Sequence, residues 1–448
     1  MTFQEFKEIA VAQAKALGIA EYEFYYQSGE STSVDVFQHE VNEFSASMEG
    51  GVCFRCIVGG KMGYASTEEL SEVQAKAVVT RAMENAAVLE SEEAVFLAEG
   101  GKTYEPLTLK GYELPSTEAL IQKVLETQEK LYAADEKIID GCQTSGFCQS
   151  MKIAISNSKG LDLEYENKAS GLVAAAVVSD GTVMEDDYQI KLGKLDEIDT
   201  DALTKKAAAG AVAKLGGEVA PTAACPVVFD PKAMSQLLAT YSSIFSSESA
   251  QKGLSKLAGQ EGAVVASPLV TLVDDPFHPE NPMPINFDAE GSPTRCKKVI
   301  EKGVLNTLLY NLKTAAVAGK ETTGNASKAG YDSSVAIRPF TMYLESGTDT
   351  EEQLLEKAGN GVYINFLGGL HAGANAISGD FSLQSAGYLI ENGKKTVRVK
   401  SFTVAGNFYD LLKNITAVGS NGELPRAMGM TAFGAPSVLV EGLSIAGK

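Results

Sequence analysis

The sequence predicts an α+β protein, in which an N-terminal region of mixed sheet and helices precedes a β-rich C-terminal domain with a few helices. Two patterns support this class. Apolar stripes at helical spacing alternate with strand-like segments up to about residue 222, whereas strand and loop patterns dominate beyond residue 246. At 448 residues the chain is also too long for one ordinary core, so we expect several domains.

The first hundred residues are predicted to form one α+β domain, 1–100. Thr2 and Glu5 form a capping box in front of an amphipathic helix, and Gly18 ends that helix. A second helix is expected from about residue 67 to 90, because apolar residues recur there at i, i+3, i+4 and i+7. Short strands are expected at 22–26, 33–37, 51–58 and 62–65.

A linker with glycine and proline, 100–115, leads into a middle α+β segment, 101–222, that should pack with the first domain. Ser116 is expected to cap a helix, and strands rich in Val, Ile and Tyr follow from about 141 to 192. A short Ala-rich helix, 201–215, completes this segment. We therefore place the last boundary near Pro221.

The remaining domain, 223–448, opens with an apolar strand at 226–229. Asp230 and Pro231 then supply an N-cap and a first-turn proline for the next helix. Further along, Asn392 and Gly393 separate two alternating segments, and this pair accepts positive φ at both central turn positions. The pair predicts a two-residue type I′ hairpin.

The charge of the chain limits its partners. A net charge of −20 and a pI near 4.7, without clustered Lys and Arg, argue against binding to nucleic acid. The sequence has no run of about 18 apolar residues and no basic, then apolar, N-terminal segment. We therefore expect a cytoplasmic protein that does not associate with membranes.

Two of the six cysteines, Cys53 and Cys56, have C-x-x-C spacing. They lie in an apolar, strand-like run that ends at two glycines. Residues i and i+3 of a strand face opposite sides, so the two thiols should diverge and be core residues, not a redox or zinc pair.

Two polar clusters are candidate functional sites. His39 and Glu40 are expected in a strand, where adjacent side chains face opposite ways. We therefore favour the interpretation that they are ordinary surface or core residues and not a functional pair. An acidic, proline-rich stretch could supply oxygen ligands to Mg²⁺ or Ca²⁺, although a solvated loop is favoured. Its ionisable residues are Asp274, Asp275, His278, Glu280, Asp288 and Glu290.

A glycine-rich loop at 366–380 is the third candidate. Its glycines indicate close backbone approach or unusual dihedral angles. His371, Ser378 and Asp380 in this loop could converge as a general-base site, but no clear nucleophile lies nearby in the sequence, so structural packing is favoured.

Familiar catalytic motifs are absent from the sequence. It contains no G-x-S-x-G elbow, no G-x-G-x-x-G after a strand, no complete P-loop and no H-E-x-x-H. With only three histidines, a histidine-rich metal site could form only if distant segments met.

Several longer motifs nevertheless resemble the TldD/PmbA family, also called the modulator of DNA gyrase family. The resemblance spans most of the chain and includes its N-terminal GVCFRCIVGGKMGYAST. The C-terminal motifs are VDDP, FDAEGSPT, GLHAG, SGDFSLQ, YLIENGK, FTVAGNFYDLL and PSVLVEGLSIAGK.

The resemblance implies a cytosolic, zinc-dependent peptidase system of two related subunits, of which one carries the metal. In the metal-bearing type, an H-E-x-x-x-H helix and a cysteine near the C-terminus bind zinc. The matching positions in this chain are Ala239, Thr240 and Ile244, and its last cysteine is Cys296. Since these side chains cannot replace zinc ligands, the chain resembles the PmbA, or TldE, type of subunit.

We therefore expect a non-catalytic subunit without its own cofactor, which works with a zinc-bearing TldD-type partner or as a homodimer. It would help to form a chamber that admits unfolded peptides, which can bind by strand addition. His371, Ser378 and Asp380 are the peptide-binding or interface candidates. Two alternatives stay open: an autonomous divalent-metal hydrolase that uses the acidic stretch and His371, and a homodimeric, non-catalytic scaffold.

Overall fold

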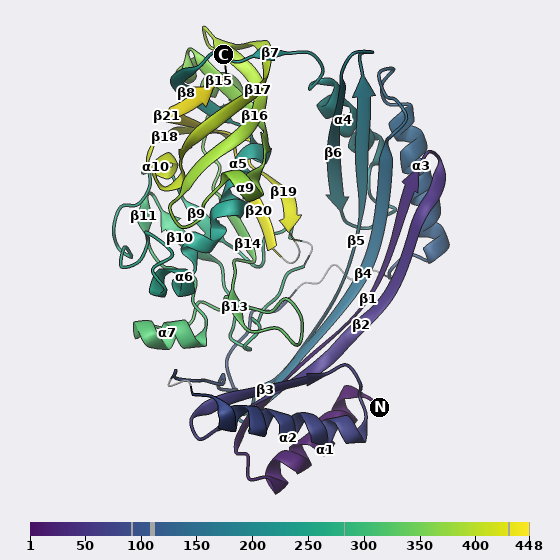
Figure 1. Ribbon diagram of the computed structural model, residues 1–448, viewed down its shortest axis with the longest axis vertical. Coiled ribbons are helices and arrows are strands. Elements are labelled where there is room, and N and C mark those ends of the chain that lie inside the picture. The colour runs from purple at the N-terminus through teal and green to yellow at the C-terminus, as the bar shows by residue number, and fades with distance from the viewer. Residues whose placement is uncertain (91–92, 108–112, 282, 429–430, 448) are drawn as a thin grey trace.

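One long, curved antiparallel sheet organises the N-terminal half of the protein (Figure 1). The computed structural model describes residues 1–90, 93–107, 113–281, 283–428 and 431–447. The strand order is β3-β2-β1-β4-β5-β6, so the strands of both N-terminal segments share one sheet. The strands are β1 (Glu21–Phe37), β2 (Glu40–Val58), β3 (Lys61–Thr67), β4 (Gln143–Asn157), β5 (Asp162–Ser179) and β6 (Met184–Leu192).

The sequence prediction of separate strands at 22–26 and 33–37 is wrong, because β1 runs unbroken through the polar residues between them. Those residues pair with β2 on one side and β4 on the other, so the backbone ladders maintain the strand where apolar alternation is missing. The prediction that His39 lies in a strand is also wrong. Gln38 and His39 form the hairpin turn with φ of 49° and 66°, and the His39 ring stacks on Tyr132 at 4.6 Å.

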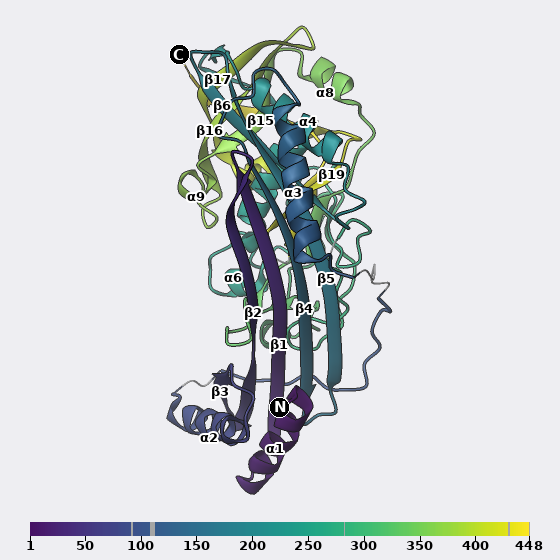
Figure 2. The ribbon, with the colours of Figure 1, turned by 90° about the vertical axis from the view of Figure 1, so that its right-hand side faces the viewer.

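Four helices cover one face of the sheet, two at each end (Figure 2). Helices α1 (Phe3–Ala16) and α2 (Glu72–Val88) pack on the lower end, and α3 (Thr117–Tyr132) and α4 (Thr200–Val212) pack on the upper end. The Thr2 capping box is present as predicted. Helix α2 begins later than expected, because residues up to Thr67 belong to β3.

Cys53 and Cys56 lie on opposite faces of β2, as predicted. Cys56 packs under α1 and α2 with Phe24 and Phe54, whereas Cys53 lies in the cluster on the other face. Burial raises the pKa of both thiols. The pair therefore belongs to two separate cores.

The C-terminal half contains two larger sheets around a common core, which confirms the α+β class. The first has the order β18-β21-β8-β15-β16-β17-β7, and β21 also pairs with β17. Its strands are β7 (Glu218–Val219), β8 (Ala223–Phe229), β15 (Gly361–Gly368), β16 (Asp380–Glu391), β17 (Lys394–Asn407), β18 (Ile415–Val418) and β21 (Val438–Ala446).

The second sheet has the order β11-β10-β9-β14-β20-β19. It comprises β9 (Leu272–Asp274), β10 (Lys297–Glu301), β11 (Val304–Leu305), β14 (Thr341–Leu344), β19 (Glu423–Met428) and β20 (Thr431–Ala435), and β12 (Ala326–Ser327) pairs with β13 (Ala336–Ile337) separately. The helices are α5 (Pro231–Tyr241), η1 (Ser242–Phe245), α6 (Ser247–Gln251), α7 (Leu312–Ala318), α8 (Glu351–Ala358), α9 (Leu370–Gly373) and α10 (Phe408–Lys413).

Local signals in this half are confirmed. Asp230 caps α5 by accepting the Ala233 N–H at 2.6 Å, with Pro231 in the first turn. Asn392 and Gly393 have φ of 50° and 76° between β16 and β17, as a type I′ turn requires. In the part of the chain that the structure describes, no helix is both long and apolar enough to cross a membrane.

The two halves meet at a lower junction that contains buried charges. Tyr25 and Tyr165 of the long sheet pack with Phe287 of the C-terminal half. Beside this cluster, the Arg55 guanidinium lies 2.6 Å from Glu23 and 4.0 Å from Glu290, and all three side chains are buried.

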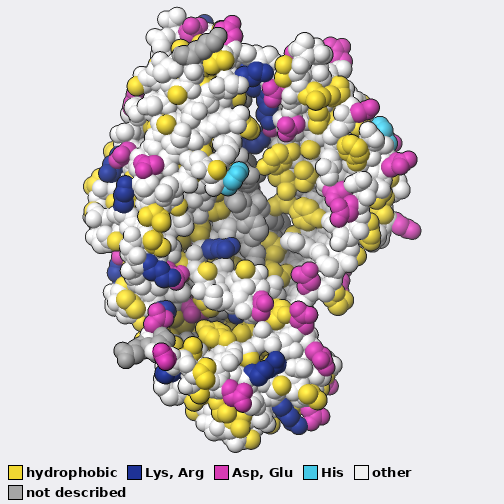
Figure 3. Space-filling view, viewed as in Figure 1, with side chains coloured by type: hydrophobic (Ala, Val, Ile, Leu, Met, Phe, Trp, Pro, Cys, Tyr) yellow, Lys and Arg dark blue, Asp and Glu magenta, His cyan; other side chains and the backbone are white. Residues whose placement is uncertain are grey.

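An upper junction joins the same two halves at the far end of the sheet. Lys232 of α5 lies 3.1 Å from Asp187 of β6, and Lys400 of β17 lies 3.2 Å from Glu185 of β6. Between the junctions the surface is hollowed, and hydrophobic side chains line the wall on the side of the long sheet (Figure 3).

Arg55 should be the most costly charge to remove from the lower junction. Arg55→Met leaves Glu23 and Glu290 buried without their cation, so we expect a loss of about 3–5 kcal/mol in the free energy of unfolding. Adding Glu23→Gln to the same chain should recover part of the loss, and denaturant unfolding measures both.

The control is Lys76→Met, which removes an ion pair whose side chains are 51% and 64% exposed. It should cost less than about 1 kcal/mol. Equal losses for Arg55→Met and Lys76→Met would contradict the structural role of the buried charges.

Candidate functional site

The glycine-rich loop links β15 to β16 and contains the short helix α9. Gly369 and Gly379 have φ of 71° and 84°, a conformation that side-chain-bearing residues rarely adopt. A Cβ on Gly379 would also lie 2.5 Å from the Tyr409 ring. The glycines are therefore needed for the backbone path and for close packing on α10.

Ser378 and Asp380 come together at the end of this loop. The Asp380 N–H donates to Ser378 Oγ at 3.3 Å, and the Asp380 carboxylate accepts from Asn407 Nδ2 at 2.8 Å. The amide donor lowers the pKa of Asp380. Asp380 is exposed and Ser378 is half-buried, so the loop offers an ionised carboxylate to the solvent.

His371 is not joined to this pair. It is exposed on α9, and within the described residues no hydrogen bond or ion pair links its ring to Ser378 or Asp380. The loop therefore combines a serine and an aspartate in one hydrogen-bonded group, with the histidine on a neighbouring turn. It can bind polar groups, and no proton relay is assembled.

The positions that correspond to the zinc-binding helix of the resembling family lie on α5 and η1. Ala239 is partly buried against the C-terminal core, and Ile244 is 1% exposed within it. Thr240 donates its hydroxyl to the Gln236 carbonyl at 2.8 Å. Methyl, hydroxyl and alkyl groups of this kind do not provide the imidazole, thiolate or carboxylate donors of a zinc site, so the residues do not fit the metal.

The acidic stretch is largely buried, so the prediction of a solvated loop is wrong. Asp274 is fully buried and accepts the N–H groups of Phe340 and Thr341 at 2.8 and 3.1 Å. Its other oxygen accepts from Lys297 Nζ at 2.9 Å and from Asn325 Nδ2 at 2.7 Å. This carboxylate stabilises the sheet around β9 and has no oxygen left without a donor.

Asp288 has a similar structural role. Its two carboxylate oxygens accept N–H groups from Glu290, Ser292 and Ala326 at 2.9 to 3.0 Å. Among the described residues, no three His, Cys, Asp or Glu side chains gather in a group that could hold a metal ion. These protein donors explain why buried carboxylates occur here without such a group.

Glu290 is the carboxylate that faces the lower junction. It accepts the Leu312 N–H at 2.9 Å and lies 4.0 Å from Arg55. Burial raises its pKa to about 7 despite Arg55, and nearby Asp288 and Glu23 act in the same direction.

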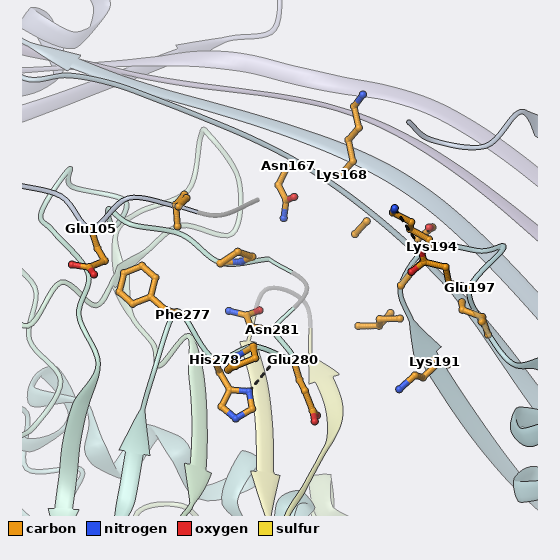
Figure 4. A pocket seen from close by; sticks show the side chains of 18 of the residues that line it. Glu105, Asn167, Lys168, Lys191, Lys194, Glu197, Phe277, His278, Glu280 and Asn281 are labelled. Atoms are coloured by element: carbon orange, nitrogen blue, oxygen red, sulfur yellow. Dashed lines mark hydrogen bonds and ion pairs between the residues drawn. The ribbon is translucent and has the colours of Figure 1, made fainter. Parts of the chain in front are cut away.

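A pocket of about 690 Å³ lies between the long sheet and the C-terminal half. In Figure 4, Asn167 of β5 points into this space from one side, and His278 and Asn281 face it from the other. The Glu280 N–H donates to His278 Nδ1 at 3.2 Å, which orients the ring. The volume is in the range of ligand-binding pockets.

Sequence reasoning found only part of this pocket. It selected His278 and Glu280, but as members of a possible metal loop. Lys191, Lys194 and Asn167 line the same space from β5 and the end of β6. No local pattern marks them, because only the sheet register brings them opposite residues 277–281.

Comparison with known families gives matches along most of the chain. The PmbA/TldA metallopeptidase domain 1 matches residues 22–86, the central domain of the same family matches 112–215, and its C-terminal domain matches 222–447. These matches confirm the family resemblance, and the predicted domain boundaries remain predictions.

Individual proteins of similar sequence agree with these family matches. An uncharacterised protein of Methanocaldococcus jannaschii is 27% identical over 88% of this chain and 90% of its own length. A protein of Haemophilus influenzae named as a metalloprotease PmbA homologue is 24% identical over 87% and 85%.

Two solved structures share the fold. A Thermotoga maritima protein, described as a candidate modulator of a DNA gyrase, superposes with a TM-score of 0.89 at 32% identity, covering 99% of this chain and all of that chain. TldE from Thermococcus kodakarensis gives 0.87 at 23% identity and 99% coverage of both chains, which supports the fold alone.

The raised pKa of Glu290 predicts a pH dependence. A carboxyl whose pKa is higher in the folded than in the unfolded chain stabilises the fold fully below about pH 4, and this contribution is lost as the pH rises to about 7. Glu290→Gln removes the titrating group. Between pH 5 and pH 8, the free energy of unfolding of the wild type should therefore fall by about 1–3 kcal/mol relative to that of Glu290→Gln. Denaturant unfolding at each pH measures this difference.

The comparison variant is Glu84→Gln, which changes an exposed carboxylate on α2. Its stability should follow that of the wild type across the same range. A constant difference between wild type and Glu290→Gln at every pH would show that Glu290 does not titrate in this window.

Proposed function

Because the chain belongs to the PmbA/TldD metallopeptidase family, we propose that it is the metal-free subunit of a peptidase system. In this proposal it helps to form the chamber in which unfolded peptides are held for a zinc-bearing partner. The observation that carries the proposal is the set of side chains at the zinc positions, Ala239, Thr240 and Ile244.

The contacts of α5 support the proposal that this chain keeps the scaffold around the zinc positions but does not bind the metal. Helix α5 packs on β15, β19 and β20, and α9 lies next to it. The Tyr241 hydroxyl donates to the Asp380 carbonyl at 2.8 Å, which links the degenerate helix to the start of β16. A chain that keeps this scaffold and lacks the ligands is suited to shaping a chamber beside another subunit's zinc.

The hollow between the two junctions is the proposed peptide space. Phe147, Val173 and Ala175 are partly buried on the face of the long sheet opposite to the helices. An apolar wall of this kind suits side chains of an unfolded chain, and folded proteins would be excluded by the two junctions. We expect the substrates to be extended peptides of varied sequence.

The loop with His371, Ser378 and Asp380 is proposed to contact the peptide or the partner subunit. Its exposed, ionised carboxylate and neighbouring hydroxyl are suited to binding main-chain N–H groups. The net charge of −20 argues against direct contact with nucleic acid. We also propose the cytoplasm as the location.

The two other functions have weaker support. An autonomous hydrolase would need metal ligands from the acidic stretch, yet Asp274 and Asp288 are occupied by protein donors. A homodimeric scaffold would not associate with a peptidase partner, and the first test below distinguishes it from the proposed subunit.

The first test mixes the purified full chain with a purified family member that carries the H-E-x-x-x-H motif. We expect the two to co-elute in size-exclusion chromatography. We also expect cleavage of a denatured protein at least about ten-fold faster than by the zinc-bearing member alone, because the chamber is then complete. Cleavage by the isolated chain would support the autonomous hydrolase, and failure to associate would support the scaffold.

The second test changes the loop. Ser378→Trp places a bulky ring beside Asp380 and should reduce cleavage by the mixture, or the affinity for the partner, by at least about ten-fold. Val88→Trp is the control, since Val88 is 78% exposed at the end of α2. If Ser378→Trp leaves both cleavage and partner affinity unchanged, the loop has no role at the chamber or interface.

A further inference from the structure

We propose that residues 42–49 of β2, which we call the open edge, bind an extended basic peptide as an additional antiparallel strand. This inference rests on the proposed function, because it takes an unfolded peptide as the ligand. It names a strand of the long sheet, in a different half of the protein from α5 and the glycine-rich loop, where this chain itself would hold the peptide.

The open edge exists because β3 pairs only with the lower part of β2. Strand β1 pairs with β2 from residue 40 to residue 57, whereas β3 pairs with residues 52–58. Figure 2 shows β2 at the left border of the sheet, with β3 beside its lower end. Within the described residues, no strand pairs with residues 42–49 on the side away from β1. All of them are exposed except Ser47, which is half-buried, so both faces of this segment reach solvent.

The described residues that flank each undescribed stretch contact other parts of the protein. Leu89 accepts a hydrogen bond from the start of β3, and Glu93 pairs with Lys313 of α7 at 2.6 Å. Glu113 pairs with Lys168 of β5 at 3.2 Å, and both β1 and β4 separate β5 from β2. The other undescribed residues belong to the C-terminal half: 282, 429–430 and 448. No undescribed stretch is therefore anchored beside the open edge.

The register shows which backbone groups face outwards from the open edge. The Ser158 N–H donates to the Tyr22 carbonyl at 2.9 Å, so Tyr22 directs its groups towards β4. Because these groups alternate along a strand, even-numbered residues of β1 face β4 and odd-numbered ones face β2. Odd-numbered residues of β1 and β2 lie opposite each other from residue 43 of β2 onwards, so Phe44, Ala46 and Met48 direct their groups away from β1. Within the described residues, these three make no backbone hydrogen bond on that side.

The side chains of the same three residues form an apolar stripe. Phe44 lies opposite Val34, which is buried under the helices of the upper end, so Phe44, Ala46 and Met48 lie on the helix-bearing face of the sheet. Phe44 is 48% exposed and Met48 is 77% exposed. The stripe is therefore available to apolar side chains of an added strand.

The opposite face of the open edge is acidic. Glu43 and Glu49 are exposed carboxylates on the side of the hollow, and residues 40–51 contain no Lys, Arg or Pro. Free edges are commonly protected against strand addition by Lys or Pro, so this edge lacks both guards. A second copy that paired Phe44 with Met48 would bring Glu43 opposite Glu49, and such like-charge pairs are destabilising. The favoured occupant is therefore a strand with Lys or Arg on the hollow side and apolar residues on the other.

The pairing also predicts which peptide amides are used. Directly opposite residues of an antiparallel pair share a face, and the outward backbone groups belong to Phe44, Ala46 and Met48. The apolar residues of the peptide should thus exchange hydrogen bonds with β2. The N–H groups of its basic residues should point away from β2.

The test uses the full chain, without a partner, and a fluorescein-labelled peptide of five Val-Lys repeats in fluorescence anisotropy. N-methylation of the second and fourth valines should weaken binding at least about ten-fold, because any three consecutive valines include one of them and each loses an N–H that bonds the edge. N-methylation of the second and fourth lysines should change binding less than about two-fold. Both peptides carry the same charge, so equal weakening would show binding by charge alone and would overturn the proposal, as would an absence of binding.

Protein variants locate the binding on β2. Ala46→Pro removes an edge N–H that the pairing with β1 does not use, so the sheet should persist while affinity falls at least about ten-fold. Ala46→Val keeps the N–H and an apolar side chain on the same face, so its affinity should stay within about two-fold of the wild type. Equal affinities for Ala46→Pro and Ala46→Val would overturn the added strand.

A charge variant keeps the proposal falsifiable if Ala46→Pro does not fold. The double variant Glu43→Gln, Glu49→Gln should bind the Val-Lys peptide at least about five-fold more weakly, because it removes the carboxylates that face the lysines. The control is Glu8→Gln with Glu84→Gln, which changes the net charge equally at exposed positions on α1 and α2. Equal affinities for the two double variants would contradict the proposed charge pairing.

The oligomeric state of the isolated chain identifies a competing occupant. If light scattering shows that Ala46→Pro converts a dimer into a monomer while peptide affinity is unchanged, a second copy covers the open edge and the peptide proposal is overturned. Co-elution with a zinc-bearing family member does not depend on peptide binding by the isolated chain. Failure of this inference is therefore distinguishable from failure of the proposed function.

Discussion

The buried charges of Glu23, Arg55 and Glu290 are the constraint on which the arrangement of the two halves depends. A single guanidinium lies between two carboxylates from different halves, and all three side chains are buried. Since removing one partner would leave an uncompensated buried charge, the lower end of the long sheet is held firmly against the C-terminal half. The hollow above it follows from this fixed contact.

The upper junction has a different character. Lys232 and Lys400 are partly exposed, and they bond carboxylates of β6. Such pairs contribute less to stability than buried ones and are more sensitive to salt. The long sheet is therefore strongly anchored at one end and more weakly at the other, with the pocket between the two. This placement connects the packing to the proposed peptide space.

Local sequence signals predicted local structure well. Thr2 with Glu5, Asp230 with Pro231, and Asn392 with Gly393 each determine a cap or a turn through residues a few positions apart, and all were found. The continuity of β1 was missed, because its polar middle is held by two neighbouring strands. The burial of Asp274 was missed for a related reason, since Lys297 and Asn325 reach it from distant positions.

The candidate site also has one part that the sequence predicts and one part that it does not. The family motifs identified the positions of the absent zinc ligands, because those positions are read from sequence alone. The pocket could not be predicted, since its walls come from the 105–107 segment, β5, the end of β6 and residues 277–281. No spacing in the sequence records that these segments meet, and only the sheet register and the lower junction bring them together.

Zinc content tests the central claim most directly. Elemental analysis of the isolated full chain and of its complex with a zinc-bearing family member would give the number of zinc ions per chain. The account predicts none in the isolated chain after dialysis against micromolar zinc, and one per pair in the complex. One zinc bound per isolated chain, or two per pair, would contradict the assignment of this chain as the metal-free subunit.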